Sequence, residues 1–408
     1  MAAFPQGEPA PSDGSLPLDS DSPFSPTFHA YLHIPFCKVR CGYCDFNTYT
    51  ATELRGAKQN DFARVIAREI ELSEQVMQAA QAPDRELASV FFGGGTPTQL
   101  PAADLVFLLG KLRASFGLAA GAEVTTEANP DDVDKAYLAE LAAGGFTRVS
   151  FGMQSAVPNV LKVLDRTHEP RRLPEVVKWA KEVGLQTSVD LIYGAPGESI
   201  GDWETTLDSA LQLETDHISA YSLIVEPGTK LARLISRGEL SEPDEDEQAT
   251  KYEIADSAFS GAGLSWYEVS NWARSPEHQS RHNLAYWNSA DWWGFGPGAH
   301  SHVAGVRWWN RKHPADYQNR LVGGESPALE REVLTPITQL EERVLLQIRT
   351  RSGLPIEVLR ELEVFRAETI AGLIADQLVE PQPAIGGILR LTQKGRLLAD
   401  TVVRQLLA

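Results

Sequence analysis

The hydrophobic pattern of the first half of the chain alternates between short apolar runs and amphipathic segments. The apolar runs predict six strands, over 30–34, 89–92, 124–127, 148–153, 187–193 and 218–223. Amphipathic segments between them predict helices, among them one with Phe62, Val65, Ile66 and Ile70 on one face and two more, over 133–143 and 173–183, that stop at glycines. Repeated strand–helix order implies parallel strands with right-handed crossovers, so we expect an α/β fold, a partial (β/α)6 barrel open on one side.

The pattern changes after about residue 228, where an acidic, helix-prone stretch (239–258) leads into a segment rich in Trp and Tyr. The expected regions are a disordered N-terminal segment (1–27), the barrel (28–265), an aromatic-rich connecting region (266–335) and a small C-terminal module (336–408). Disorder is expected at the start because Pro, Ser, Gly and Asp cannot repay their ordering entropy. The last region should hold two or three short helices, a strand over 388–392 and a further helix, which is typical of a winged-helix-like α+β domain.

Charge narrows the partners of the protein. Lys and Arg total 37 against 55 Asp and Glu, which gives a net charge of −18 and disfavours nucleic acid as a partner. No apolar run approaches the roughly 18 residues of a spanning helix, and residues 1–27 lack a basic n-region and an apolar h-region. We therefore expect a cytoplasmic protein.

The three cysteines of the chain lie within eight positions, in the loop HIPFCKVRCGYCDF that follows the first strand. This C-x3-C-x2-C spacing, from Cys37 through Cys41 to Cys44, suits a [4Fe-4S] cluster in which three thiolates each bind one iron. The fourth iron is left open, and the amino and carboxylate groups of S-adenosylmethionine (SAM) can chelate it. A zinc site that recruits His33 is the alternative, and three unconnected buried cysteines are a third, less economical one.

The loop, with Tyr43 before the last cysteine and Tyr31 six residues before the first, resembles the radical SAM superfamily and specifically its HemN-like branch. Further matches follow along most of the chain. The resemblance implies a radical SAM barrel that holds the cluster and SAM at the carboxyl ends of its strands.

By this resemblance the SAM-binding residues are Tyr31, Tyr43, Gly94, Gly95, Thr96, Glu127, Gln154, Arg166 and Asp190. Physically, the Arg166 guanidinium suits a carboxylate, whereas Glu127 and Asp190 are acceptors suited to ribose hydroxyls or an ammonium group. The Gly-Gly-Gly-Thr run that follows the second strand also fits an ordinary tight turn, and each charged residue alone fits an ordinary salt bridge. Their joint position at strand ends favours a shared site.

One position separates two branches of the family. Oxygen-independent coproporphyrinogen III oxidases resemble C-x3-C-x2-C-x-C, whereas Phe46 stands here where the fourth cysteine would be. The haem chaperones of the HemW type resemble this chain more fully, through the segment 282–287, which has the pattern H-N-x-x-Y-W. The resemblance implies haem as cargo and respiratory haemoproteins as recipients, and it leaves room for a peripheral membrane association.

Haem needs an axial ligand and flat apolar walls, so His282, with Tyr and Trp nearby, is the first candidate ligand. Its alternative role is a hydrogen-bonded histidine in an aromatic core, and His300 and His302 are weaker candidates. We assign no catalytic side chain, because SAM cleavage does not require that a porphyrin be transformed. The competing classes are the radical SAM oxidase and a tRNA-modifying enzyme, and the net charge disfavours the second.

Overall fold

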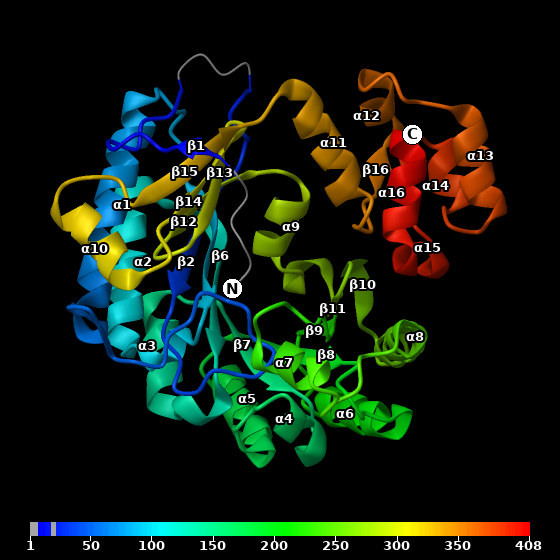
Figure 1. Cartoon of the computed structure of the whole chain (residues 1–408), viewed down its shortest axis with the longest axis horizontal. Helices are drawn as coiled ribbons and strands as arrows, with labels where there is room; N and C mark the ends of the chain where they lie inside the picture. The colour runs from blue at the N-terminus through cyan, green and yellow to red at the C-terminus, as the bar shows by residue number, and fades with distance from the viewer. Residues whose placement is uncertain (1–6, 18–21) are drawn as a thin grey trace.

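The computed structural model describes residues 7–17 and 22–408. Its centre is a run of six parallel strands in chain order, each hydrogen-bonded to the next. They are β2 (Phe28–Ile34), β5 (Leu87–Gly94), β6 (Leu118–Ala128), β7 (Arg148–Gln154), β8 (Gln186–Tyr193) and β9 (His217–Ser222). All six predicted strands are confirmed, and the α/β fold class with them (Figure 1).

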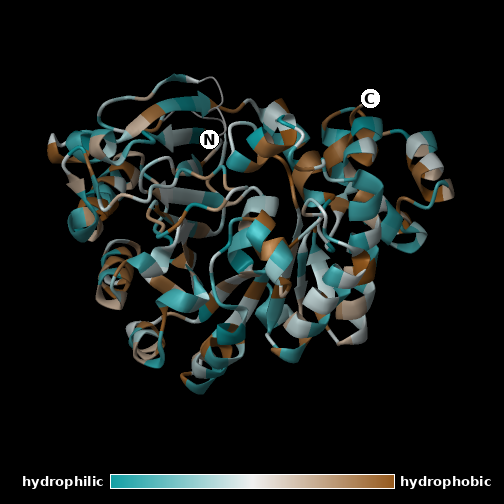
Figure 2. Cartoon of the chain, turned by 60° about the horizontal axis from the view of Figure 1, so that its bottom comes forward, coloured by the Kyte–Doolittle hydropathy of each residue, from teal (hydrophilic) through white to brown (hydrophobic). Residues whose placement is uncertain are grey.

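Helices accompany these strands. They are α1 (Phe62–Ala79), α2 (Ala102–Phe116), α3 (Lys135–Gly144), α4 (Pro158–Val163), α5 (Leu173–Glu182), α6 (Ile200–Gln212), α7 (Lys230–Ser236) and α8 (Glu245–Gly261). Six of them cover the outer face of the sheet, whereas α4 and α7 pack near the carboxyl ends of the strands, in a cluster with Ile192 and Leu223. Hydrophilic and hydrophobic positions alternate along the outer helices in Figure 2. The predicted apolar face of α1, from Phe62 to Ile70, is buried in the main core, so amphipathicity fixes which side of each helix meets the sheet.

The aromatic-rich region was expected to connect two domains, but its strands extend the barrel sheet at both edges. Beside β2 lie β12 (Asp291–Phe295), β13 (His300–Val303), β14 (Val306–Asn310) and β15 (Ala328–Val333), and beside β9 lie β11 (Asn271–Ala273) and β10 (Ser265–Glu268). The expected boundary at residue 265 therefore falls inside β10. Because β12 pairs parallel to β2 and the later strands run antiparallel, strand–helix alternation did not predict them.

The prediction of a disordered N-terminal segment is wrong for its described residues. Strand β1 (Glu8–Pro9) pairs with β15, the Ala10 amide donates to the Leu329 carbonyl, and the Ser326 amide donates to the Ser12 carbonyl. Hydrogen bonds to the edge of the sheet offset the entropy lost when this segment is ordered, and amino-acid composition does not show that such an edge is present. Residues 1–6 and 18–21 of the predicted segment lie outside the described residues.

The C-terminal region has its own hydrophobic core and lies to one side of the barrel (Figure 1). Its helices are α11 (Pro336–Gln347), α12 (Ile356–Glu361), α13 (Ala367–Ala375), α14 (Pro381–Ile385), α15 (Gln393–Leu397) and α16 (Ala399–Leu407). Strand β16 (Leu354–Pro355) pairs antiparallel with β17 (Ile388–Leu389), and three of these helices lie between them in the chain. The predicted strand is shorter and the helices more numerous than expected. Two further α-helices are α9 (Arg281–Trp287) and α10 (Pro314–Val322), and β3 (Glu53–Leu54) pairs with β4 (Ala57–Lys58) in a small antiparallel ribbon.

The C-terminal region docks on α8 and β10. Arg396 forms an ion pair of 2.7 Å with Asp256 and lies 4.4 Å from the ring centroid of Trp266. In the described part of the chain, no helix combines the length and the hydropathy needed to cross a bilayer.

Candidate functional site

Three adjoining cavities open at the carboxyl ends of the parallel strands. The cluster cavity, of about 260 Å³, is lined by the cysteine loop, Gly94 to Thr96, Glu127 and Arg166. The barrel cavity, of about 470 Å³, lies inside the sheet and includes Asp190 and His282 in its lining. The outer cavity, of about 580 Å³, is lined by β13 and by side chains of α9 and α11. Parallel barrels place their chemistry at this end, as the sequence predicted.

The three cysteines are free thiols, half-buried, and they line the cluster cavity together. The loop is held by backbone bonds, because the Cys37 amide donates to the Tyr49 carbonyl (2.9 Å) and the Thr96 amide to the Phe36 carbonyl (2.8 Å). Burial raises the pKa of Cys37 to about 11, so this thiol is protonated near neutral pH without a metal. Metal binding would release that proton, as thiolate ligation requires.

His33, which the zinc alternative requires, has other partners. Its Nε2 lies 2.9 Å from the Asn47 carbonyl oxygen, and its Nδ1 lies 3.2 Å from the Tyr31 hydroxyl. Within the described ranges, no group of three or more His, Cys, Asp or Glu side chains could hold a single metal ion. The assignment of the three thiols as ligands of a cluster therefore remains a prediction.

The glycine run at the end of β5 brings backbone against the cysteine loop. A Cβ at Gly95 would lie 2.7 Å from the Phe36 carbonyl oxygen and 3.0 Å from Cys37 Sγ, so only glycine fits there. Thr96 Oγ1 lies 3.6 Å from the same sulfur. The Gly-Gly-Gly-Thr run is therefore more than a surface turn, because it forms one wall of the cluster cavity.

Two carboxyl groups face the cavities with few counter-charges. Glu127 accepts a hydrogen bond from the Gly94 amide (3.1 Å), and Asp190 accepts one from Ser150 (2.9 Å). Desolvation raises the pKa of Glu127 to about 8, repulsion by Asp190 adds to that shift, and desolvation raises the pKa of Asp190 too. Such carboxyls favour a cationic ligand, so the ammonium and sulfonium groups of SAM fit this donor set.

Gln154 lines both inner cavities, and Arg166 lines the cluster cavity. The Arg166 guanidinium donates to the Gly152 carbonyl (2.8 Å) and lies 3.8 Å from Cys41 Sγ. Gln154 is buried at the end of β7 with a positive φ of 63°, a conformation that is strained for a residue with a side chain. Tyr43 lines both inner cavities and Tyr31 lines the barrel and outer cavities. The structure thus brings together all nine residues predicted for SAM, although contact with SAM itself stays a prediction.

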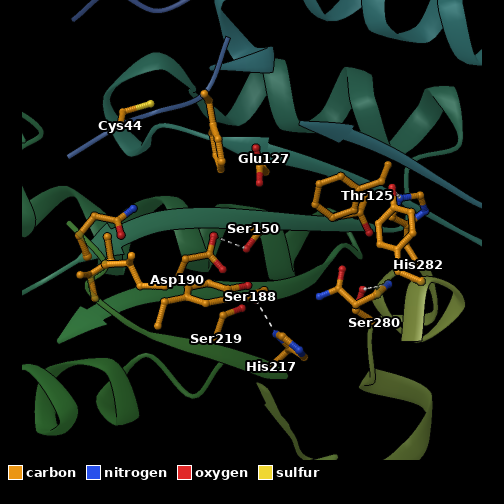
Figure 3. Close-up of a pocket in the computed structure, with 18 of the residues that line it drawn as sticks. Cys44, Thr125, Glu127, Ser150, Ser188, Asp190, His217, Ser219, Ser280 and His282 are labelled. Atoms are coloured by element: carbon orange, nitrogen blue, oxygen red, sulfur yellow. Dashed lines mark hydrogen bonds between the residues drawn. The ribbon is translucent and has the colours of Figure 1, made fainter. Parts of the chain in front are cut away.

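His282 lies at the opposite end of the barrel cavity from Cys44 (Figure 3). Its Nδ1 is 2.9 Å from the Ser89 hydroxyl, its Nε2 is 2.8 Å from the Tyr286 hydroxyl, and its ring stacks on Phe91. Burial lowers the pKa of His282 well below its ordinary value, so the imidazole is neutral. A haem iron would have to displace one of these hydroxyls.

Phe46 is 57% exposed and lines all three cavities. The position that distinguishes the oxidases from the haem chaperones by sequence therefore carries an apolar ring where the three cavities meet.

Sequence reasoning missed the polar interior of the barrel. Ser150, Ser188 and Ser219 face the barrel cavity, and Arg148 forms a buried ion pair of 3.1 Å with Glu123 at its wall (Figure 3 shows the serines). Barrel interiors are normally filled by branched apolar side chains. Polar residues at alternate positions of strands that are otherwise apolar were the signal available in the sequence.

Two protein-family models match this chain, one over the barrel and one over the C-terminal region. The model of the Radical SAM superfamily matches residues 31–210, and that of the HemN C-terminal domain matches residues 334–398. The chain is 46% identical over 381 residues to "Heme chaperone HemW" of Mycobacterium tuberculosis (strain ATCC 25618 / H37Rv), covering 93% of this chain and 95% of that protein. The chain belongs to the HemW family of radical SAM proteins.

More distant members of the family are also similar along most of their length. "Heme chaperone HemW" of Escherichia coli (strain K12) is 35% identical over 68% of this chain and 71% of its own. A solved structure of coproporphyrinogen III oxidase (HemN) from Escherichia coli has a TM-score of 0.78 at 22% identity, over 94% of this chain and 90% of that one. This likeness shows a shared fold. All cluster and SAM candidates lie within 31–210, whereas His282 and His302 lie between the two matched ranges.

Proposed function

We propose that this HemW-family protein is a haem chaperone that binds haem, a [4Fe-4S] cluster and SAM, and that it delivers haem to respiratory haemoproteins from the cytoplasm. The observation that carries the proposal is the exposed ring of Phe46, which joins a three-thiol cavity to two aromatic-walled cavities. The relatives named "Heme chaperone HemW" in Mycobacterium tuberculosis and Escherichia coli support the same function.

Cys37, Cys41 and Cys44 would hold the cluster, and the acceptors Glu127 and Asp190 would hold the cationic groups of SAM. When bound, this pair supplies one-electron chemistry that no side chain provides. The protein residues bind and orient: the Gly95 backbone packs against the cysteine loop and holds it at the cavity wall, and Arg166 would offer a fork for a carboxylate.

A haem titration of the full-length protein followed by absorbance tests the proposal. We expect a saturable Soret band in the parent protein, and a protein that binds no haem would refute the chaperone function. The oxidase alternative is tested separately by anaerobic incubation of the reconstituted protein with SAM, reductant and coproporphyrinogen III. The proposal expects no protoporphyrinogen IX, and its formation would establish an oxidase instead.

A further inference from the structure

The outer cavity has the size and composition of a site for a flat cofactor. Its volume of about 580 Å³ is within the usual range of ligand pockets, and the rings of Tyr31, Phe46, Tyr286 and Trp292 line it. Glu342 and Leu346 of α11 close it from the C-terminal side. Both domains therefore contribute to this cavity.

His302 is placed in this cavity as a metal-ligating histidine would be. The residue is 8% exposed, and it lines the cavity from strand β13. Its Nδ1 lies 3.1 Å from the carbonyl oxygen of Ala290. A carbonyl can only accept a hydrogen bond, so Nδ1 carries the proton and the lone pair is on Nε2. Metal-binding histidines commonly fix their tautomer through such a bond.

The charge state of His302 agrees with this geometry. Burial lowers the pKa of His302 below its ordinary value, although Asp291 and the Ala290 carbonyl oppose the shift, so the ring is neutral at pH 7. Arg307 and Glu342 also face the group, and Arg307 acts to lower its pKa whereas Glu342 acts to raise it. A neutral imidazole with a lone pair on Nε2 is the form that binds iron.

His282 differs from His302 in this respect. Both of its ring nitrogens are hydrogen-bonded, to Ser89 and to Tyr286. Tyr286 is packed edge-to-face on Trp292 at 4.7 Å, and Trp292 lies 5.1 Å from the His302 ring. His282 therefore orients a ring that forms the wall of the outer cavity.

A porphyrin with two propionates also needs a cation. Among the described residues that line the outer cavity, Arg307 supplies it, and its register on β14 places it directly opposite His302. The guanidinium forms ion pairs with Glu332 (2.7 Å) and Glu342 (2.8 Å). A porphyrin propionate can replace the Glu342 carboxylate, because the contact with Arg307 remains one between a guanidinium and a carboxylate.

We propose that haem binds in the outer cavity with Nε2 of His302 as its axial ligand. This inference rests on the proposed function, because it names the site at which the chaperone holds its cargo. His282 acts as a positioning residue through Tyr286.

The test is a haem titration of the full-length parent and of His302→Ala, His302→Met, His282→Ala and His300→Ala, each checked for folding by circular dichroism. We expect His302→Ala to weaken haem binding at least tenfold. His302→Met should give the altered visible bands of a thioether-ligated haem, a readout that a purely structural role would not produce.

His300 is the matched control, since it lies two residues away on the same strand and lines the same cavity. The His300→Ala and His282→Ala variants should keep the parent's ligation spectrum, with affinity changed by no more than a few fold. If His302→Ala and His302→Met match the parent, or if His282→Ala or His300→Ala loses the ligation bands, the inference is wrong while the chaperone function stands. If the parent itself binds no haem, the proposed function fails first.

Discussion

The Glu127→Gln variant should be more stable than the parent protein when neither metal nor SAM is bound. Glu127 faces the cluster cavity with one hydrogen bond from the Gly94 amide, and desolvation raises its pKa from 4.5 to about 8. A raised carboxyl pKa means that the stabilising contribution of this group is complete below pH 4.5 and is lost as the pH rises toward 8.

The magnitude follows from the width of that interval. At pH 7 the folded protein keeps this carboxyl mostly protonated whereas the unfolded chain ionises freely, which costs up to about 3 kcal/mol of stability at ~1.36 kcal/mol per pH unit above 4.5. Water in the cavity screens part of this cost and a buried amide retains some desolvation penalty, so we expect a gain of about 1–2 kcal/mol at pH 7. The gain should be near zero at pH 4.5 and largest above pH 8.

Urea unfolding of the metal-free protein at several pH values measures this difference. Glu123→Gln is the matched control, because it makes the same change on the same strand but breaks the buried pair with Arg148 (3.1 Å). That variant should lose about 3–5 kcal/mol. A Glu127→Gln protein that is less stable than the parent at every pH would refute the assignment of Glu127 as an uncompensated carboxyl awaiting a cation.

Three further predictions concern other parts of the chain. Lys251→Met removes the buried cation beside Glu198 (3.1 Å) and should lower the free energy of unfolding in urea by about 3–5 kcal/mol. Adding Glu198→Gln should restore part of that loss, and fully additive losses in the double variant would contradict the pairing. Cys41→Ser should keep its far-ultraviolet circular dichroism but take up less iron on anaerobic reconstitution, and parental iron content would remove Cys41 as a ligand. Arg396→Ala, which breaks the ion pair with Asp256, should make the C-terminal region more sensitive to proteolysis, whereas an unchanged digestion pattern would show that the other contacts suffice.

The barrel was predictable because its strands are continuous apolar runs and its helices have one apolar face. The edge strands were not, because β12 to β14 are short and rich in Trp and His, and three of the six residues of β15 are charged, patterns that local periodicity does not separate from a loop. The pairing of Glu8–Pro9 with β15 depends on a partner more than 300 residues away, so it could not be read from composition.

The candidate site shows the same division. Spacing alone placed the cysteines and the glycine run at neighbouring strand ends, since parallel strands bring those ends together. The roles of the histidines depend on the hydrogen-bond partner of each ring nitrogen. No sequence pattern indicates that Ser89 contacts His282 or that the Ala290 carbonyl contacts His302. The sequence ranked His282 above His302, whereas the geometry favours the reverse order for a metal.

The shared walls of the outer cavity bear on how the protein unfolds. The barrel and the C-terminal region have separate hydrophobic cores, so each can open as its own cooperative unit. A ligand that contacts both β13 and α11 stabilises only the state in which the two units are docked. Loading of the cavity should therefore merge two melting transitions into one, and a recipient that pulls α11 away would lower the affinity for the cargo at the moment of transfer.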